Sequence, residues 1–381
     1  MAILKKAPRK MWKFLDYFNK CIKKNQNQIF LYSNLGFRDN VRAVYDYLVE
    51  NGYNKKFKIV CSLNDYKRYR HCAPCNVKFV GNFTGLFKFF RSKFCFYCFG
   101  KYPVKPSDKQ AVINLWHGMP IKRIGNMEQG NEKTNYNYFT YLLCTSEFFR
   151  EIMKESFNCS DEQIFICGQP RTDIMLNNLS GGSENNALTP LMNADGRKLM
   201  LWLPTFRTDY ENETELLSNE IFIKLDKLCE KYGWSIMIKL HPLSKAENIS
   251  INKYKFIKIF KQEILDKNNI NLYSILKESE CLITDYSSVY FDYLLLDRPI
   301  GFTVHDMNSY SQDRGFVFEN PGEYMPGEKI ITGMDLLEFA ESVFSGKDRY
   351  KKERERLCRL FNKYSDGENC RRIIEKAGIK K

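Results

Sequence analysis

Long apolar runs are missing from this 381-residue sequence, because no stretch of about 18 consecutive apolar residues occurs in it. This argues against a membrane-spanning helix. The first residues also lack the apolar core and small-residue cleavage site of a signal peptide. We therefore expect a reducing compartment, in which the 13 cysteines are free thiols. No internal repeat indicates a solenoid or a propeller.

Several ligand-binding motifs are also absent. The sequence has no G-x-G-x-x-G loop, no G-x-x-x-x-G-K-[ST] loop and no D-x-D pair. This argues against a dinucleotide-dependent oxidoreductase, a P-loop NTPase and a metal-dependent transferase. We therefore expect no cofactor and no metal.

Two C-x-x-C pairs have the spacing of a zinc ribbon: Cys72 with Cys75, and Cys95 with Cys98. However, residues 93–100 are typical of a buried strand, in which residues three apart point to opposite faces. Core cysteines are therefore the preferred interpretation, and a zinc site is the alternative.

Basic residues outnumber acidic ones, with 59 Lys and Arg against 45 Asp and Glu and a net charge of +14. Such an excess favours a polyanionic partner: a nucleic acid, an anionic membrane or a phosphate-rich substrate. The basic residues are dispersed and no nucleic-acid recognition module is present. We therefore expect no nucleic-acid partner.

Residues 1–27 have the pattern of a basic amphipathic helix. Apolar residues recur every three or four positions with lysines between them, namely Met11, Trp12, Phe14, Leu15, Phe18, Cys21 and Ile22. Such a helix can lie in a bilayer interface with its lysines toward anionic head groups. It can equally pack on the protein body, and both interpretations stay open.

The rest of the chain alternates short apolar runs with helical patterns, which predicts βαβ units and parallel sheets. A chain of this length is longer than a domain with a single hydrophobic core usually is. We therefore expect two doubly wound domains, at 28–190 and 191–345, followed by charged helices at 346–381. The Asn-, Gly- and Ser-rich stretch 177–198 is interpreted as the linker or as a variable loop near the domain boundary. The expected strands are 28–33, 57–63, 78–81, 93–100, 111–117, 141–146, 164–168, 198–204, 235–242, 255–260, 280–285 and 299–304. Helices are expected at 38–52, at 146–158 with Ser146 as N-cap, and around 219–232.

Two serines, Ser287 and Ser288, lie between the strand 280–285 and the helix that follows it. Unpaired N–H groups and the helix dipole at such a junction favour an anion. Asp292 lies one turn deeper on the same helical face, where its carboxylate can accept hydrogen bonds from ribose hydroxyls. A diphosphate on the serines and a sugar on the aspartate suit a nucleotide-diphosphate donor; an ordinary N-cap is the alternative.

Two of the four histidines, His117 and His241, end predicted strands, one in each half of the chain. Histidine can act as a general base or, when protonated, stabilise phosphate charge. Gly118 and Pro120 predict a tight turn beside His117, and Lys239 lies close to His241. A buried, hydrogen-bonded residue is the alternative for each histidine.

Strand-end arginines complete the pattern. Arg171, within "GQPRTD", and Arg207, within "LPTFRTD", carry guanidinium groups suited to bidentate phosphate contact. Together, the hydroxyl, imidazole, ammonium and guanidinium groups at strand ends predict a diphosphate-binding cleft.

Taken together, these motifs resemble the CDP-glycerol glycerophosphotransferases of teichoic acid and capsule synthesis. The matching pieces, in the family's order, are "GFRDNVRAVYDYLVENG", "WHGMPIKRIG", "GQPRTD", "LPTFRTD", "KLHP", "TDYSSVYFDYLLLDRPIGF", "RGFVFE" and "DGENCRRI". The resemblance implies a GT-B-type fold, with two Rossmann-like domains facing across a cleft. It places the acceptor on the N-terminal domain and the CDP-linked donor on the C-terminal domain.

The resemblance further implies metal-independent transfer of glycerol phosphate from CDP-glycerol to a hydroxyl of a lipid-linked or polymeric acceptor, with release of CMP. It implies that His117 and His241 are the catalytic pair. The implied donor contacts are His117, Gly118, Met119, Pro120, Ile121, Arg171, Pro204, Thr205, Lys239, Leu240, His241, Ser287, Ser288 and Asp292. One departure from the family is the Lys239-Leu240 pair, because Arg or Lys frequently precedes the histidine directly there.

A lipid-linked polyanionic acceptor would also explain the positive charge and would place the protein at the cytoplasmic side of the cell membrane, as a peripheral protein. Alternative activities are transfer from CDP-ribitol and transfer or epimerisation of nucleotide sugars by a GT-B enzyme. The acceptor, a primase or polymerase role and the oligomeric state stay open.

Overall fold

The computed structural model describes residues 9–177, 196–204, 216, 218–239 and 253–381, with side chains from residue 13 onward. Contacts divide the chain into two compact units. The first unit comprises residues 1–119, 124–173 and 361–381, and the second comprises 120–123 and 174–360. The last 21 residues therefore belong to the first unit. From the sequence we expected 346–381 to form a separate segment. The domain boundaries expected from the sequence stay predictions.

The first unit contains a seven-stranded parallel sheet in the order β3-β2-β1-β4-β5-β6-β7. This is the strand order of a doubly wound domain, extended by one strand. The strands are β1 (Asn25–Ser33), β2 (Lys58–Leu63), β3 (Val77–Val80), β4 (Ser92–Tyr97), β5 (Ala111–Asn114), β6 (Tyr141–Cys144) and β7 (Ile164–Ile166).

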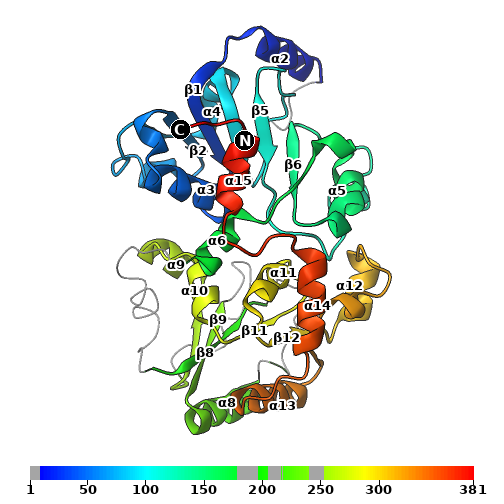
Figure 1. Cartoon of the computed structure of the whole chain (residues 1–381). Coiled ribbons are helices and arrows are strands. Elements are labelled where there is room, and N and C mark those ends of the chain that lie inside the picture. The colour runs from blue at the N-terminus through cyan, green and yellow to red at the C-terminus, as the bar shows by residue number, and fades with distance from the viewer. Residues whose placement is uncertain (1–8, 178–195, 205–215, 217, 240–252) are drawn as a thin grey trace. The chain divides into compact units, whose positions relative to one another are not determined.

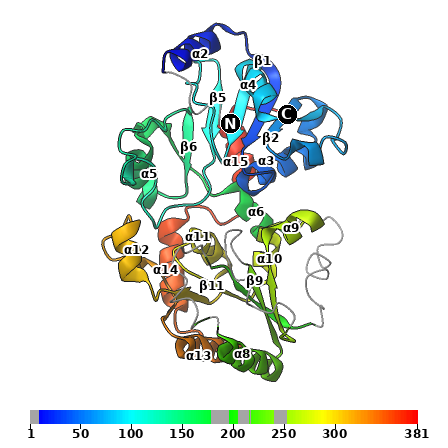
Figure 2. The ribbon, with the colours of Figure 1, turned by 180° about the vertical axis from the view of Figure 1, so that it is seen from behind.

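Helices cover both faces of this sheet, which is why its central strands are almost continuously buried, as in Gln28–Ser33 of β1. The helices are α2 (Arg9–Cys21), α3 (Asp39–Glu50), α4 (Asn82–Arg91), α5 (Arg150–Phe157) and α15 (Asn369–Lys376). The short helix α6 (Asp173–Leu176) spans the boundary, because the second unit begins again at Ile174. Helix α15 crosses in front of the sheet in Figure 1 and behind it in Figure 2. Six short 3₁₀ turns join these elements: η1 (Tyr53–Lys55), η2 (Tyr66–Arg68), η3 (Gly125–Met127), η4 (Glu147–Phe149), η5 (Asp161–Gln163) and η6 (Pro170–Thr172).

Asp173 fastens the C-terminal segment to the first unit. Its carboxylate accepts the backbone N–H groups of Asn369 at 3.0 Å and Cys370 at 2.7 Å, at the start of α15. Burial raises the pKa of Asp173 to about 6, while these hydrogen bonds act in the opposite direction. Phe361 also belongs to this unit, where its ring packs against that of Phe149.

The second unit contains a six-stranded parallel sheet in the order β10-β9-β8-β11-β12-β13. The strands are β8 (Lys198–Trp202), β9 (Trp234–Lys239), β10 (Ile257–Phe260), β11 (Cys281–Thr284), β12 (Ile300–Thr303) and β13 (Glu328–Ile330). The helices are α8 (Asn219–Tyr232), α9 (Gln262–Asn268), α10 (Leu272–Glu278), α11 (Val289–Tyr293), α12 (Met307–Asp313), α13 (Gly333–Phe344) and α14 (Lys351–Phe361), with 3₁₀ turns η8 (Leu294–Leu296) and η9 (Pro321–Tyr324). Helices α8 and α13 lie side by side in both views (Figures 1 and 2), and α13 places Phe344 on Trp234, with the rings 4.5 Å apart.

The expected α/β class and its two doubly wound parallel sheets are confirmed. Every expected strand is present, but most end earlier than the apolar pattern does, because the residues after them form turns at the sheet edge. The sequence did not predict β13, a strand of three residues. Ser146 is at an N-cap position, as expected, but it caps the 3₁₀ turn η4 that leads into α5, and its hydroxyl makes no capping hydrogen bond.

No helix in the described part of the chain is both long and apolar enough to cross a bilayer. All 13 cysteines are free.

Candidate functional site

His117 lies three residues after the end of β5, in a turn of the first unit. Its ring stacks with Trp116 at a centroid distance of 3.9 Å and with Phe99 at 4.8 Å. The turn uses unusual backbone angles: Trp116 has a φ of 50° and Gly118 a φ of 120°. Since left-handed angles disfavour side chains, a glycine after the histidine has a physical reason. Packing and backbone together orient the half-buried imidazole.

The side chain of Asn40 stabilises this turn through hydrogen bonds. It is fully buried near the start of α3, and its amide nitrogen lies 3.0 Å from the carbonyl oxygen of Trp116 and 3.3 Å from that of Leu115. The same amide contacts the side-chain oxygen of Gln169 at 2.5 Å, and its own oxygen accepts the backbone N–H of Arg171. One side chain therefore joins the turns after β5 and β7.

Arg171 also contacts the turn that contains His117. The residue is 4% exposed, and Nη1 lies 2.7 Å from Oδ2 of Asp39 and 3.1 Å from the carbonyl oxygen of His117. The sequence predicted a phosphate contact for this guanidinium. The structure uses it to hold the backbone of His117, and the phosphate contact stays a prediction.

A thiol completes the cluster. Sγ of Cys98 donates to the carbonyl oxygen of Trp116 at 2.8 Å and lies 3.5 Å from Oδ1 of Asp39. Burial, with Asp39 adding to it, raises the pKa of Cys98 well above its usual value. It therefore acts as a neutral donor.

Sequence reasoning missed Asp39 and Asn40 as site residues. They open the helix within "GFRDNVRAVYDYLVENG", a segment that matched the family, and a polar pair at a helix start is normally interpreted as a cap. The sequence feature that could have identified this pair as site residues was its position in a segment that matches the family.

The chain passes into the second unit directly after Met119. There Ile121 accepts the backbone N–H of Val317 at 3.0 Å, and Arg123 donates its backbone N–H to Gly315 at 3.1 Å. The side chains of Met119 and Ile121 are 1% exposed. Their predicted donor contacts are not tested by this packing.

The second unit gathers several predicted residues at one sheet edge. Strands β9, β8 and β11 are neighbours and parallel, so their carboxyl ends share an edge. Lys239 ends β9, Pro204 follows β8, and Ser287 and Ser288 follow β11. The strand order reverses between β8 and β11, and such switch points are where doubly wound sheets bind ligands.

Hydrogen bonds fix the loops at this switch point. The hydroxyl of Thr284 donates to the carbonyl oxygen of Leu203 at 3.0 Å. Tyr286 is fully buried, and its hydroxyl donates to Asp306 at 2.9 Å. The half-buried Ser287 and Ser288 therefore extend from an anchored loop.

The serines lie where the sequence placed them, with Ser288 at the N-cap of α11. Its side chain makes no capping hydrogen bond, and Ser287 accepts the backbone N–H of Val289 only at 3.5 Å. Helix α11 itself has only five residues before it tightens into η8. Because this helix is so short, the residues at the neighbouring strand ends matter as much to the predicted anion site as the start of the helix does.

Asp292 is 2% exposed and accepts a hydrogen bond of 2.6 Å from the hydroxyl of Tyr273 on α10. The structure therefore gives this carboxylate a protein partner, and its predicted ribose contact stays a prediction. Thr205, Leu240 and His241 lie outside the described residues, so the predicted pairing of His117 with His241 stays a prediction too.

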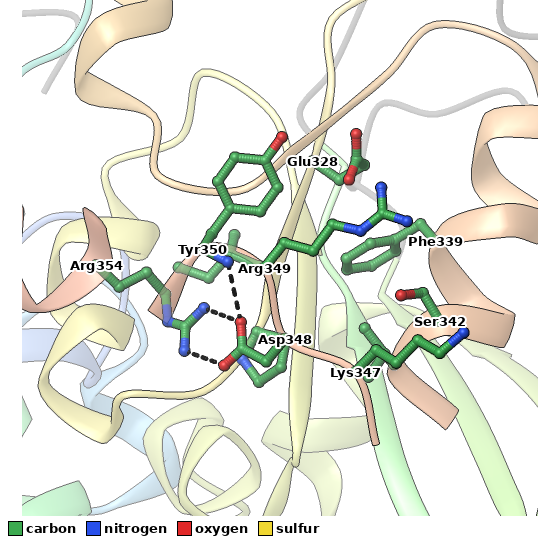
Figure 3. A pocket seen from close by; sticks show the side chains of 11 residues that line it. Glu328, Phe339, Ser342, Lys347, Asp348, Arg349, Tyr350 and Arg354 are labelled. Atoms are coloured by element: carbon green, nitrogen blue, oxygen red, sulfur yellow. Dashed lines mark hydrogen bonds and ion pairs between the residues drawn. The ribbon is translucent and has the colours of Figure 1, made fainter. Parts of the chain in front are cut away.

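A separate small pocket in the second unit lies beside β12 and α13 (Figure 3). The space in it is about 20 Å³, enough for about one water. Arg354, 1% exposed, forms a double hydrogen bond with Asp348 there, at 2.7 and 2.5 Å, and lies 3.3 Å from Asp297. This pocket is a structural ion-pair site.

Within the described ranges, no group of three or more His, Cys, Asp or Glu side chains could hold a metal ion. Cys95 and Cys98 are buried, whereas Cys72 and Cys75 are exposed. The zinc interpretation gains no support there.

Residues 15–377 match the family model described as CDP-glycerol:poly(glycerophosphate) glycerophosphotransferase. The chain belongs to this family. A teichoic acid glycerol-phosphate primase of Bacillus subtilis (strain 168) is 30% identical over 69% of this chain and 66% of its own length. The teichoic acid ribitol-phosphate polymerase TarK of Staphylococcus aureus (strain NCTC 8325 / PS 47) is 25% identical over 72% of this chain and 53% of its own length. These matches thus cover less than two thirds of either relative.

The fold agrees with this membership. The solved structure of the wall teichoic acid polymerase TagF superposes with a TM-score of 0.77 at 20% identity, covering 97% of this chain and 93% of the other. This chain therefore shares the fold of that polymerase.

Proposed function

We propose that this protein transfers glycerol phosphate from CDP-glycerol to a hydroxyl of an acceptor and releases CMP. The family match over residues 15–377 carries this proposal. The position of Pro204, Ser287 and Ser288 at the switch point of the second unit supports it.

The donor diphosphate binds at that switch point in this proposal. Hydroxyl and N–H groups of Ser287 and Ser288 donate to its oxygens, and Lys239 on the neighbouring strand end supplies positive charge. The cytidine and its ribose lie deeper, toward Asp292.

His117 acts as the general base. It takes the proton of the acceptor hydroxyl while that oxygen attacks the phosphorus distal to the cytidine. The bond from this phosphorus to the bridging oxygen breaks, CMP leaves with the bonding electrons, and a phosphodiester forms. His241 and the groups at the switch point stabilise the negative charge that develops on the diphosphate. His241 completes the proposed catalytic pair.

The acceptor is a lipid-linked polyanion of teichoic acid or capsule synthesis in this proposal. The net charge of +14 favours such an acceptor and an anionic membrane surface. The protein then works as a peripheral protein at the cytoplasmic side of the cell membrane.

The test is a donor screen on the purified protein. CDP-glycerol, CDP-ribitol and a UDP-sugar are each incubated with a lipid-linked acceptor, and release of CMP or UDP and the product mass are measured. We expect CMP from CDP-glycerol and a product heavier by one glycerol phosphate. Release of UDP alone would overturn the proposal.

His117→Ala is the decisive variant, and His71→Ala is its matched control because His71 is an exposed histidine of the same unit. We expect His117→Ala to lose at least about a hundredfold in kcat, within the range of a general base, and the control to keep full activity. Near-normal turnover of a folded His117→Ala protein would remove that residue from catalysis.

CDP-ribitol is the second candidate donor, because the resemblance to the ribitol-phosphate polymerase extends over 72% of this chain. The same screen separates the two, since the added masses of ribitol phosphate and glycerol phosphate differ.

A further inference from the structure

A groove in the first unit runs along β3, which is an edge strand of the seven-stranded sheet. The space in it is about 420 Å³, within the usual range of ligand sites. Its polar lining comes from the turn after β2, from β3 and from the start of α4, namely Tyr66, Arg70, Lys78, Gly81 and Thr84. We call the space that these five residues line the edge groove.

The edge groove is positively charged. Its lining contains no Asp or Glu, and within the described residues neither Arg70 nor Lys78 forms an ion pair with a carboxylate. From residue 66 to residue 107 the sequence has nine Lys or Arg and no Asp or Glu. Arg70 and Lys78 are both exposed, so a ligand from solvent can reach them.

Lysines gather beside this groove although like charges repel. Burial lowers the pKa of Lys58 at the start of β2, and the positive charges of Lys78 and Lys88 lower it further. Lys78 lies opposite Val60 in the β2–β3 pair, so Lys58 and Lys78 are on one face of the sheet. Because the lining offers no carboxylate to offset this repulsion, the positive field is available to an anionic ligand.

Hydroxyl groups accompany the cations. Tyr66 and Thr84 add a phenolic and an aliphatic hydroxyl to the lining. The ring of Tyr66 packs closely on Gly81, where an added methyl group would come within 3.1 Å of it. Ammonium, guanidinium and hydroxyl groups together suit a ligand that carries both phosphate and polyol groups.

The edge groove shares a sheet edge with His117. The strands of this sheet are parallel, so Tyr66, Gly81 and His117 follow the carboxyl ends of β2, β3 and β5 at one edge. Strands β3 and β5 are four strand spacings apart, or about 20 Å. A single glycerol phosphate, with six backbone bonds of about 1.5 Å each, does not span this distance. A ligand that contacts both places is therefore a chain of several repeats.

We propose that the edge groove binds the phosphodiester chain of a polymeric acceptor, several repeats away from the hydroxyl that reacts. The inference rests on the proposed function, because it gives the acceptor of that reaction a second contact site. Arg70 and Lys78 neutralise phosphates of the chain, and the hydroxyls of Tyr66 and Thr84 bond to its polyol groups. Since this contact is remote from the reacting atoms, it raises the affinity for long acceptors and leaves the chemical step unchanged.

Two soluble acceptors test this proposal. One is an oligomer of about ten glycerol phosphates, long enough to cover the distance, and the other carries a single glycerol phosphate. The variant is Arg70→Gln/Lys78→Gln, which removes two charges. We expect its KM for the long acceptor to rise at least about tenfold, because two charge-assisted contacts are lost. Its kcat, and its KM for the short acceptor, should equal those of the wild type.

The matched control is Lys55→Gln/Lys109→Gln. These exposed lysines precede β2 and β5, at the opposite edge of the same sheet, and their loss should change neither KM. An unchanged KM for the long acceptor in the folded Arg70→Gln/Lys78→Gln variant would overturn the proposal. So would an equal rise of KM for both acceptors, or a rise in the control variant, because loss of general positive charge would then explain the effect.

Binding of the long oligomer without any donor separates this inference from the proposed function. Calorimetry should show that the wild type binds it, more weakly at high salt, and that Arg70→Gln/Lys78→Gln binds at least about tenfold more weakly. This result without CMP release by any protein would leave the edge groove standing and remove the proposed function. CMP release from CDP-glycerol, with equal oligomer binding by wild type and variant, would do the reverse. An oligonucleotide of equal charge that binds more tightly than the oligomer would overturn the assigned ligand.

Discussion

The ion pair between Arg171 and Asp39 leads to a prediction that can distinguish two roles of Arg171: support of His117 and contact with the substrate. Arg171 is 4% exposed, and its Nη1 lies 2.7 Å from Asp39 and 3.1 Å from the carbonyl oxygen of His117. Removal of one partner from a buried pair costs about 3–5 kcal/mol. Asp39 is partly exposed and keeps the backbone N–H of Asn40 at 2.7 Å, so the lower end applies, about 3 kcal/mol.

Arg171→Met should therefore lower the free energy of unfolding by about 3 kcal/mol, plus about 1 kcal/mol for the hydrogen bond lost at the carbonyl oxygen of His117. Denaturation by urea measures this loss. A shift of the histidine by about 1 Å would lower kcat about a hundredfold, measured as CMP release, and the KM for CDP-glycerol should change little.

Asp39→Asn is the discriminating variant, because Asp39 belongs to the predicted support of His117 and not to the predicted phosphate contacts. We expect it to reduce both stability and kcat, and the Arg171→Met/Asp39→Asn double variant to be less destabilised than the sum of the two single variants. The matched control is Arg371→Met, which breaks exposed ion pairs with Glu368 and Glu375 at α15 and should cost about 1 kcal/mol at most. Strict additivity, with kcat unchanged and KM raised in Arg171→Met, would refute the supporting role and favour phosphate contact.

Two further predictions concern backbone strain and buried charge. Gly118→Ala should lower kcat about tenfold, because a φ of 120° is strained for alanine and relief of the strain displaces His117; Gly130→Ala, at a φ of 83° with no atom near its new methyl group, is the control and should keep full kcat. Asp348→Asn should lower the free energy of unfolding by about 3 kcal/mol near pH 7, because it leaves the buried guanidinium of Arg354 without its main partner. The hydrogen bonds from Arg354 lower the pKa of Asp348, so the advantage of the wild type is present above the ordinary carboxyl pKa and shrinks as the pH falls through the lowered one. A difference in stability that stays constant down to acid pH would contradict this assignment.

Local pattern was sufficient to predict most of the fold. The strands follow from short apolar runs, because both faces of a parallel sheet are covered and each central strand is almost wholly buried. Helix α8 was predicted at the residues where it occurs, since Ser218 caps its start and Gly233 ends it in the left-handed region. The short β13 was missed because three residues carry too little periodicity for a prediction.

The sequence by itself determined the two doubly wound sheets, the family motifs and the positions of His117, Ser287 and Ser288 at strand ends, because these depend on residues that are neighbours along the chain. Only the tertiary structure decided that Asn40 and Asp39 hold the turns around His117, since Gln169 and Arg171 lie 129 and 132 residues away from them. Such contacts arise where loops from separate strands meet at one sheet edge or where helices pack on a common face, and the pairing of these partners depends on topology rather than on local periodicity.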